Sequence, residues 1–258
     1  MTRILLINPN TSQATTELMV AIAQSAVSDY VGADDARSDH VGSDDVSSDQ
    51  VGSHHAGSGH VGSNHAEAGC TRVIGATARH GAAMIVDAAT LAAAAEEVVE
   101  LGLRFGRDVS GIIVSAFGDP GLVCLRRKVA VPVVGIAEAA MREAAGNARR
   151  FGIATVTPDL VGPIDDRAAA LGLGHLYTGI RLTSGDPAAL AADPDRLVRA
   201  LADAVRRCIR DDKAEAVVIG GGPLGDAATV LASCFAVPVI APIPAAVRRL
   251  MALLGNRS

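Results

Sequence analysis

Two kinds of hydrophobic run alternate along the chain. Short continuous runs rich in Val and Ile are typical of strands that are buried on both faces of a parallel sheet. Longer Ala-rich segments between them have the spacing of amphipathic helices. We predict strands over residues 4–7, 111–115, 131–136, 152–156, 216–219 and 237–240. We predict helices over residues 12–27, 88–103, 136–145, 193–211 and 245–254. This alternation favours an α/β fold with mainly parallel, doubly wound sheets flanked by helices.

The chain also contains one structural unit twice. GIIVSAFGDPGL begins at Gly111 and is followed by VPVVGIAEAAMREA, while AVVIGGGPLG begins at Ala216 and is followed by VPVIAPIPAAVRRL. An apolar run that ends in a proline turn precedes each copy: RILLINPNTS and RFGIATVTPD. The repeat predicts two pseudo-symmetric lobes with an active-site cleft between them. We expect lobe one over residues 1–136 and 243–258, and lobe two over 137–242.

Residues 30–69 interrupt the pattern with four ten-residue repeats, the first of which is YVGADDARSD. Gly, Ser, Asp and His dominate, so the segment cannot bury enough apolar area to offset the entropy of ordering. We interpret it as a low-complexity insertion in a surface loop, without a defined site, whose removal leaves the fold intact. Weak adventitious binding of a divalent metal is the alternative, because the segment is rich in histidine. These histidines are His40, His54, His55, His60 and His65.

Composition narrows the function. The 258 residues are 49% hydrophobic and can build a substantial core, but aromatic residues make up 2% and Trp is absent. The chain thus lacks a platform for stacking bases, and its net charge of −5 also argues against a nucleic-acid partner. No apolar stretch approaches a membrane span. Four cysteines without a CxxC pair indicate reduced thiols. We expect a cytoplasmic protein with a small-molecule ligand, and its Ala-rich helix faces are compatible with a homo-oligomer.

Ligands of open α/β sheets bind beyond the carboxyl ends of the strands. Four loops follow predicted strands: NPNTS, SAFGDPG, TVTPD and GGGP. The first can bind a ligand or cap a helix, the second can bind a carboxylate or be a turn capped by Asp119, and the fourth offers a bare-backbone anion nest. The predicted substrate-binding residues are Asn8, Asn10, Thr11, Ser115, Ala116, Phe117, Gly118, Thr157, Gly221 and Gly222.

INPNTS, SAFGDPGL, VPVVGIAEAA and the late VPVI together resemble the aspartate/glutamate/hydantoin racemase superfamily, most closely its hydantoin and allantoin racemase branch. The resemblance covers nearly the whole chain apart from the repeats. It implies two α/β lobes with the active site between them. It also implies racemisation of amino acids or their cyclic derivatives without a metal or organic cofactor, by two cysteines that alternate as base and acid.

The same resemblance places the two family cysteines at Ala116 and Gly221, and neither residue can transfer a proton. A general acid or base typically contributes about a hundred- to ten-thousandfold in rate, so losing both should nearly abolish the two-base reaction. Weak substitutes are Asp119, which is a feeble base at an ordinary pKa of about 3.9, and His80 in GATARHGAA. The alternative for His80 is a surface histidine.

The other reactive side chains have simpler interpretations. The hydroxyls of Ser115 and Thr157 would need a neighbouring base to activate them. We interpret Cys124 and Cys234 as core residues, and Glu138 as a carboxylate favoured by the dipole in the first turn of a helix.

Three functions stay open from the sequence. The first is an isomerase that moves the α-proton of hydantoin, allantoin, aspartate or glutamate with a pair of groups other than cysteine. The second is a ligand-binding or regulatory relative that kept the cleft without the chemistry. The third is a different reaction that uses the glycine nest and Asp119. In each case the ligand is a small carboxylate, ureide or hydantoin.

Overall fold

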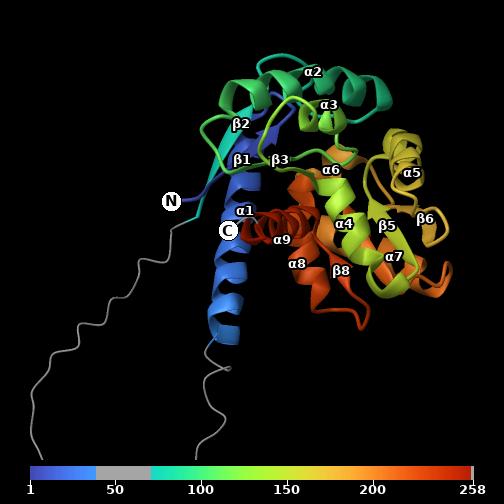
Figure 1. Ribbon diagram of the computed structural model, residues 1–258. Coiled ribbons are helices and arrows are strands. Elements are labelled where there is room, and N and C mark those ends of the chain that lie inside the picture. The colour runs from blue at the N-terminus through green and yellow to red at the C-terminus, as the bar shows by residue number, and fades with distance from the viewer. Residues whose placement is uncertain (39–70, 257–258) are drawn as a thin grey trace, which may run out of the picture.

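Two parallel four-stranded sheets form the framework of the protein, which is represented by a computed structural model describing residues 1–38 and 71–256. The first sheet contains β1 (Arg3–Asn8), β2 (Arg72–Thr77), β3 (Gly111–Val114) and β4 (Val133–Gly135) in the order β2-β1-β3-β4. The second contains β5 (Phe151–Thr155), β6 (Tyr177–Leu182), β7 (Ala216–Gly220) and β8 (Val239–Ile240) in the order β6-β5-β7-β8. The same strand order therefore occurs twice, which confirms the predicted α/β fold with two pseudo-symmetric lobes (Figure 1).

Helices connect and cover these strands. They are α1 (Gln13–Ser38), α2 (Ala88–Phe105), α3 (Leu122–Arg126), α4 (Ile136–Ala144), α5 (Val161–Ala170), α6 (Pro187–Ala191), α7 (Pro194–Arg210), α8 (Gly225–Ala232) and α9 (Pro242–Gly255). Short 3₁₀ turns span Gly146–Ala148, Pro158–Leu160 and Gly222–Leu224. Within the described ranges, no helix is long and apolar enough to cross a membrane.

Both faces of the first sheet are buried, as the continuous apolar runs predict. Successive side chains of a strand point to opposite faces. Ile4 and Leu6 accordingly pack in a cluster with residues of α1 and α9, while Leu5 and Ile7 pack in a separate cluster with residues of α2 and α3. Figure 1 shows α2 and α3 on the side of this sheet away from α9.

One central hydrophobic cluster joins the two lobes. It contains Ile113 and Val134 from the first sheet, and Ile153 and Val218 from the second. Residues of α4 and α9 belong to the same cluster, and α9 lies against α1 and α4 (Figure 1). The expected lobe boundaries, 1–136 with 243–258 and 137–242, assign α4 to lobe two and α9 to lobe one. Because the core is shared, those boundaries stay a prediction.

Several strands and helices of the structure were not predicted from the sequence. The edge strand β6 is partly exposed at all six positions, and the edge strand β2 begins with the exposed Arg72. Polar residues are common at sheet edges because they discourage pairing with other chains, and they erase the hydrophobic run that marks a buried strand. The helices α5 and α8 are short and were also not predicted.

The first repeat is partly helical, contrary to the predicted loop. Helix α1 continues to Ser38, so residues 30–38 belong to it. Val31 packs against the central cluster, which explains why the helix does not end at the repeat boundary. The remaining repeats, with their five histidines, lie outside the described residues.

Two cysteines are exposed rather than buried, so the core interpretation of Cys124 and Cys234 is wrong. In the short helix α3, Leu122 and Leu125 are the buried residues, and their spacing leaves Cys124 on the outer face. Cys234 follows the last turn of α8, whereas Cys208 is fully buried.

Gln24 of α1 holds the start of β2, which follows the insertion. Its Nε2 donates a hydrogen bond to the carbonyl oxygen of Thr71 at 3.2 Å, and its Oε1 accepts one from the amide of Val73 at 2.9 Å. The chain after the insertion is thus held by a residue well before it. Ser38 lies 14 residues further along the helix, which corresponds to about 21 Å.

We expect that replacing residues 40–69 with ten Gly-Ser residues will preserve the fold, because such a linker reaches over 30 Å or so and Gln24 keeps its bonds. The midpoint of thermal unfolding, followed by circular dichroism, should stay within about 2 °C of the parent, which corresponds to about 1 kcal/mol or less. Gln24→Ala should lower it further than this deletion does. A deletion variant that fails to unfold cooperatively would contradict the expectation.

Candidate functional site

A cavity of about 160 Å³ lies between the lobes, beyond the carboxyl ends of both sheets. Loops after β1, β2 and β3 line it from the first lobe, and loops after β5 and β7 line it from the second. The predicted binding residues that reach it are Asn10, Ser115, Ala116, Phe117, Thr157, Gly221 and Gly222. The arrangement agrees with the rule that ligands bind at this edge of a parallel sheet.

Asn8, Thr11 and Gly118 do not line the cavity. Asn8 is fully buried, and its Nδ2 donates hydrogen bonds of 2.9 Å to Asn10 Oδ1 and to Thr16 Oγ1. The amide of Thr11 donates to the carbonyl of Ala82 at 3.1 Å. The Thr11 bond holds the NPNTS loop against the loop after β2, and the Asn8 bonds hold Asn10 and the start of α1. In the described structure Asn8 and Thr11 therefore support Asn10.

The loop after β2 contributes residues that sequence reasoning missed. Met84 and Ile85 line the cavity, although their segment lacks a strand signal or a binding motif. Leu160 and Ile164, at the start of α5, line it from the second lobe. A sequence signal for them would have required recognising β2 and α5 first.

Glycines in the SAFGDPG loop serve packing against α2. Gly118 has a φ of 138°, and a Cβ there would lie 2.7 Å from Leu91 Cδ2. Gly121 has a φ of 69°, and a Cβ there would lie 2.6 Å from the carbonyl oxygen of Ala95. Both positions therefore require glycine for the backbone turn and the close approach of α2.

Asp119 caps a helix other than its own. Its side chain is fully buried, and its two carboxylate oxygens accept hydrogen bonds from the amides of Ala137 (2.9 Å) and Glu138 (2.8 Å) in the first turn of α4. Arg167 of α5 donates a third from Nε at 3.0 Å. Gly135 makes room for this contact, since a Cβ there would lie 2.3 Å from Asp119 Cγ. The prediction that Asp119 caps its own turn is therefore corrected.

Burial raises the pKa of Asp119 to about 6, although Arg167 and the two amides act to lower it. The carboxyl is therefore ionised at neutral pH. Its three partners already occupy it, and it is absent from the cavity lining. Asp119 is therefore not positioned to act as a base on a ligand in the cavity.

Glu138 is the centre of an ion network that crosses the lobes. Its carboxylate accepts hydrogen bonds from Arg126 (2.9 Å), Arg142 (3.3 Å) and Arg167 (2.9 Å). Burial acts to raise the pKa of Glu138, but Arg126 and Arg167 hold it below the ordinary value. The predicted place in the first turn of a helix is confirmed, and the network adds a bridge from α4 to α5.

Among the described residues, those that line the cavity include no carboxylate, imidazole, amine, guanidinium or thiol. Ala116 and Gly221 line it from opposite lobes. His80 lies on the exposed loop after β2 and is not part of the lining. No group of three or more potential metal ligands occurs in the described ranges.

The polar groups that do face the cavity are neutral. Ser115 Oγ contacts Met19 Sδ at 3.1 Å, and Thr157 Oγ1 lies 3.4 Å from Thr155 Oγ1. The backbone amides of Phe117 and Gly222 form no hydrogen bond with other described residues. Such amides can donate to a carbonyl or carboxylate oxygen of a ligand.

Comparison with known proteins agrees with this architecture. The family model for the Asp/Glu/hydantoin racemases matches residues 60–250. A hydantoin racemase from Rhizobium meliloti is 33% identical over 147 residues, which is 57% of this chain and 61% of that protein. A second, from Pseudomonas sp. (strain NS671), is 31% identical over 140 residues, or 54% and 56% of the two chains. The chain thus spans less than two thirds of the length of these curated relatives.

Solved structures show the same fold over greater lengths. Allantoin racemase from Klebsiella pneumoniae is 27% identical, with a TM-score of 0.77 over 100% of this chain and 89% of that one. Allantoin racemase from Pseudomonas fluorescens has a TM-score of 0.78 at 23% identity over 99% and 92% of the chains. The fold and the cavity define a two-lobed α/β protein with a cavity between the lobes. The chain belongs to the Asp/Glu/hydantoin racemase family.

Asp119→Asn should destabilise the protein by about 2 to 4 kcal/mol, because it removes a buried ion-pair partner and turns an amide donor toward a backbone N–H. Urea denaturation measures the difference. Arg142→Ala is the matched control, since that exposed ion pair should contribute less than about 1 kcal/mol. Equal stability of Asp119→Asn and the parent would refute the capping role.

Proposed function

We propose that this member of the racemase family binds a hydantoin or a related amino-acid derivative in the interlobe cavity without the family's two-cysteine proton transfer. The observation that carries the proposal is the neutral lining of the cavity. Ala116 and Gly221, which resemblance places at the cysteine positions, face it from opposite walls. A site built in this way can hold a ligand but offers no ionisable group for its α-hydrogen.

The lining also supports a class of ligand. Asn10, Ser115 and Thr157 can bond to the imide N–H and carbonyl groups of a hydantoin ring, and the amides of Phe117 and Gly222 can donate to its oxygens. Apolar side chains form most of the remaining wall. A hydantoin with an aliphatic 5-substituent matches this combination better than a ligand that carries a second polar group.

Racemisation by other groups is the second candidate. The observation in its favour is that Ser115 and Thr157 place hydroxyls on the cavity walls of different lobes. Neither hydroxyl has a hydrogen-bonded base: the partner of Ser115 is a thioether and that of Thr157 is another hydroxyl. Such hydroxyls are weak acids and bases without activation.

Proton NMR in heavy water separates the two candidates. We expect the NMR signals of 5-isopropylhydantoin to broaden in the presence of the protein. Its α-hydrogen should exchange with deuterium no faster than in a protein-free control. The signals of allantoin and aspartate, tested in the same way, should broaden less. Exchange above the control would overturn the non-catalytic proposal and favour the second candidate.

Introducing the two thiols should restore chemistry. The variant Ala116→Cys/Gly221→Cys is expected to accelerate α-hydrogen exchange of a bound hydantoin by about a hundredfold or more over the parent. A Cβ at position 221 would lie 3.0 Å from Leu224 Cδ1, the end of a flexible side chain that can move.

The matched control is Ala116→Ser/Gly221→Ser, which keeps the size of the side chains but lacks a thiolate. It should exchange no faster than the parent. If the cysteine variant binds the hydantoin and exchange stays at background, the assignment of the cysteine positions is wrong.

A further inference from the structure

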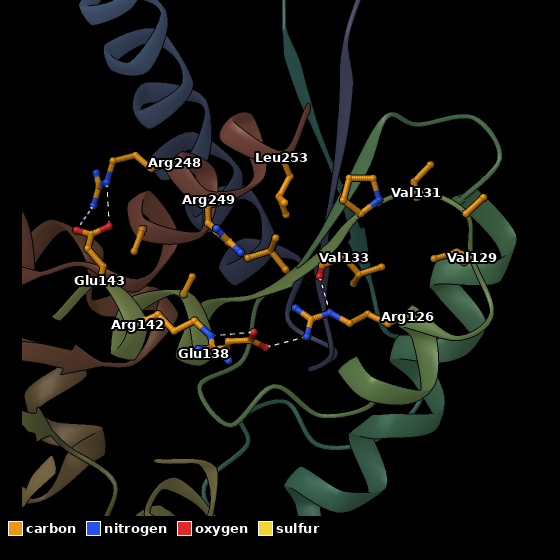
Figure 2. Close-up of a pocket in the computed structure, with 15 residues that line it drawn as sticks. Arg126, Val129, Val131, Val133, Glu138, Arg142, Glu143, Arg248, Arg249 and Leu253 are labelled. Atoms are coloured by element: carbon orange, nitrogen blue, oxygen red, sulfur yellow. Dashed lines mark hydrogen bonds and ion pairs between the residues drawn. The ribbon is translucent and has the colours of Figure 1, made fainter. Parts of the chain in front are cut away.

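A second hollow, separate from the interlobe cavity, lies between α3, α4, β4 and α9 (Figure 2). Its volume is about 910 Å³, and none of its lining residues lines the interlobe cavity. We call it the arginine groove because Arg126, Arg142, Arg248 and Arg249 line it. The two repeat segments VPVVGIAEAAMREA and VPVIAPIPAAVRRL supply most of its lining.

The arginine groove is positive although the chain as a whole carries a net charge of −5. Two carboxylates line it, those of Glu138 and Glu143, against four guanidinium groups. Arg248 neutralises Glu143 through two hydrogen bonds, of 3.0 and 2.7 Å. Glu138 is shared by Arg126 and Arg142. Four positive charges less two negative ones leave an excess of two.

Arg249 carries much of that excess. It is exposed and forms no hydrogen bond or ion pair with the described residues. Figure 2 shows it projecting from α9 into the space above Glu138. Arg126 and Arg142 approach the same space from α3 and α4, with 38% and 49% of their side chains exposed. Guanidinium groups present planar N–H donors that match the oxygens of phosphates and carboxylates.

We propose that the arginine groove is a second ligand site, which binds a small polyanion with two neighbouring phosphate groups. The two groups follow from the two sides of the groove: Arg126 stands on α3, while Arg142 on α4 and Arg249 on α9 lie on the other side of the Glu138 carboxylate (Figure 2). The hollow is several times larger than a single phosphate needs. Apolar residues such as Val131 and Leu253 complete the walls.

Occupation of the arginine groove is coupled to the interlobe cavity through Glu138. An anion competes with Glu138 for Arg126 and Arg142, and Glu138 also binds Arg167 of α5. Arg167 lies one helical turn from Ile164, which lines the interlobe cavity, and it binds Asp119 as well. A change in the charge around Glu138 therefore reaches one wall of the cavity, and such coupling is reciprocal.

Titration calorimetry with inorganic pyrophosphate at constant ionic strength tests the site on the full chain. The parent should bind it, and Arg249→Ala should weaken binding by about tenfold or more, as expected for a charge-assisted contact. Arg127→Ala removes the same charge from an exposed residue outside the groove lining, and should change the affinity by less than about twofold. Sulfate, with a single anionic group, should bind at least about tenfold more weakly than pyrophosphate.

Absence of pyrophosphate binding, or equal weakening by Arg249→Ala and Arg127→Ala, would overturn the site. Sulfate binding as tight as that of pyrophosphate would overturn the two-group ligand.

Hydrogen exchange followed by mass spectrometry tests the coupling: saturating pyrophosphate should alter deuterium uptake over residues 161–170 of α5 and leave residues 194–210 of α7 unchanged. Unaltered uptake in α5 would remove the coupling. None of these measurements uses a hydantoin, so their outcome is independent of the proposed function.

Discussion

The buried carboxylate of Asp119 holds together the parts of the molecule that surround the cavity. It joins the loop after β3 to the first turn of α4 and, through Arg167, to α5 in the other lobe. A buried charge is stable only when it is paired and hydrogen-bonded, and here three donors meet that condition. Ala116 and Phe117 on one wall and Ile164 on the other each lie within three residues of a group that makes this contact.

The contact also explains two sequence motifs as one unit. SAFGDPG supplies the carboxylate and VPVVGIAEAA supplies the helix terminus that it caps, with Gly135 leaving the space between them. Read separately, the first motif suggests a ligand loop and the second a helix start. Their joint role could not be predicted, because a hydrogen bond between residues 18 positions apart depends on how β3 and β4 pair.

The buried strands and the pseudo-symmetry could be predicted because continuous apolar runs are strong signals. The edge strands β2 and β6 could not, since they mix polar and apolar residues where one side meets solvent, whereas the edge strands β4 and β8 lie within predicted apolar runs. The site divided in the same way. Residues directly after a recognised strand, such as Ser115 and Gly221, were placed at the cavity, whereas Met84 and Ile85 follow the unrecognised β2. Asn8 was expected at the ligand, but its side-chain amide donates its hydrogen bonds to Asn10 and Thr16.

The central cluster has a consequence for the order in which the chain can fold. The first strand of the first sheet begins at Arg3. The face of this sheet that joins the central cluster is covered by α9 (Pro242–Gly255), which is synthesised more than 200 residues later. During synthesis the N-terminal lobe must wait, with apolar side chains such as Ile113 and Val134 uncovered, until the second lobe has been translated. The lobes therefore complete their cores together, so unfolding should be a single cooperative event although the architecture is duplicated.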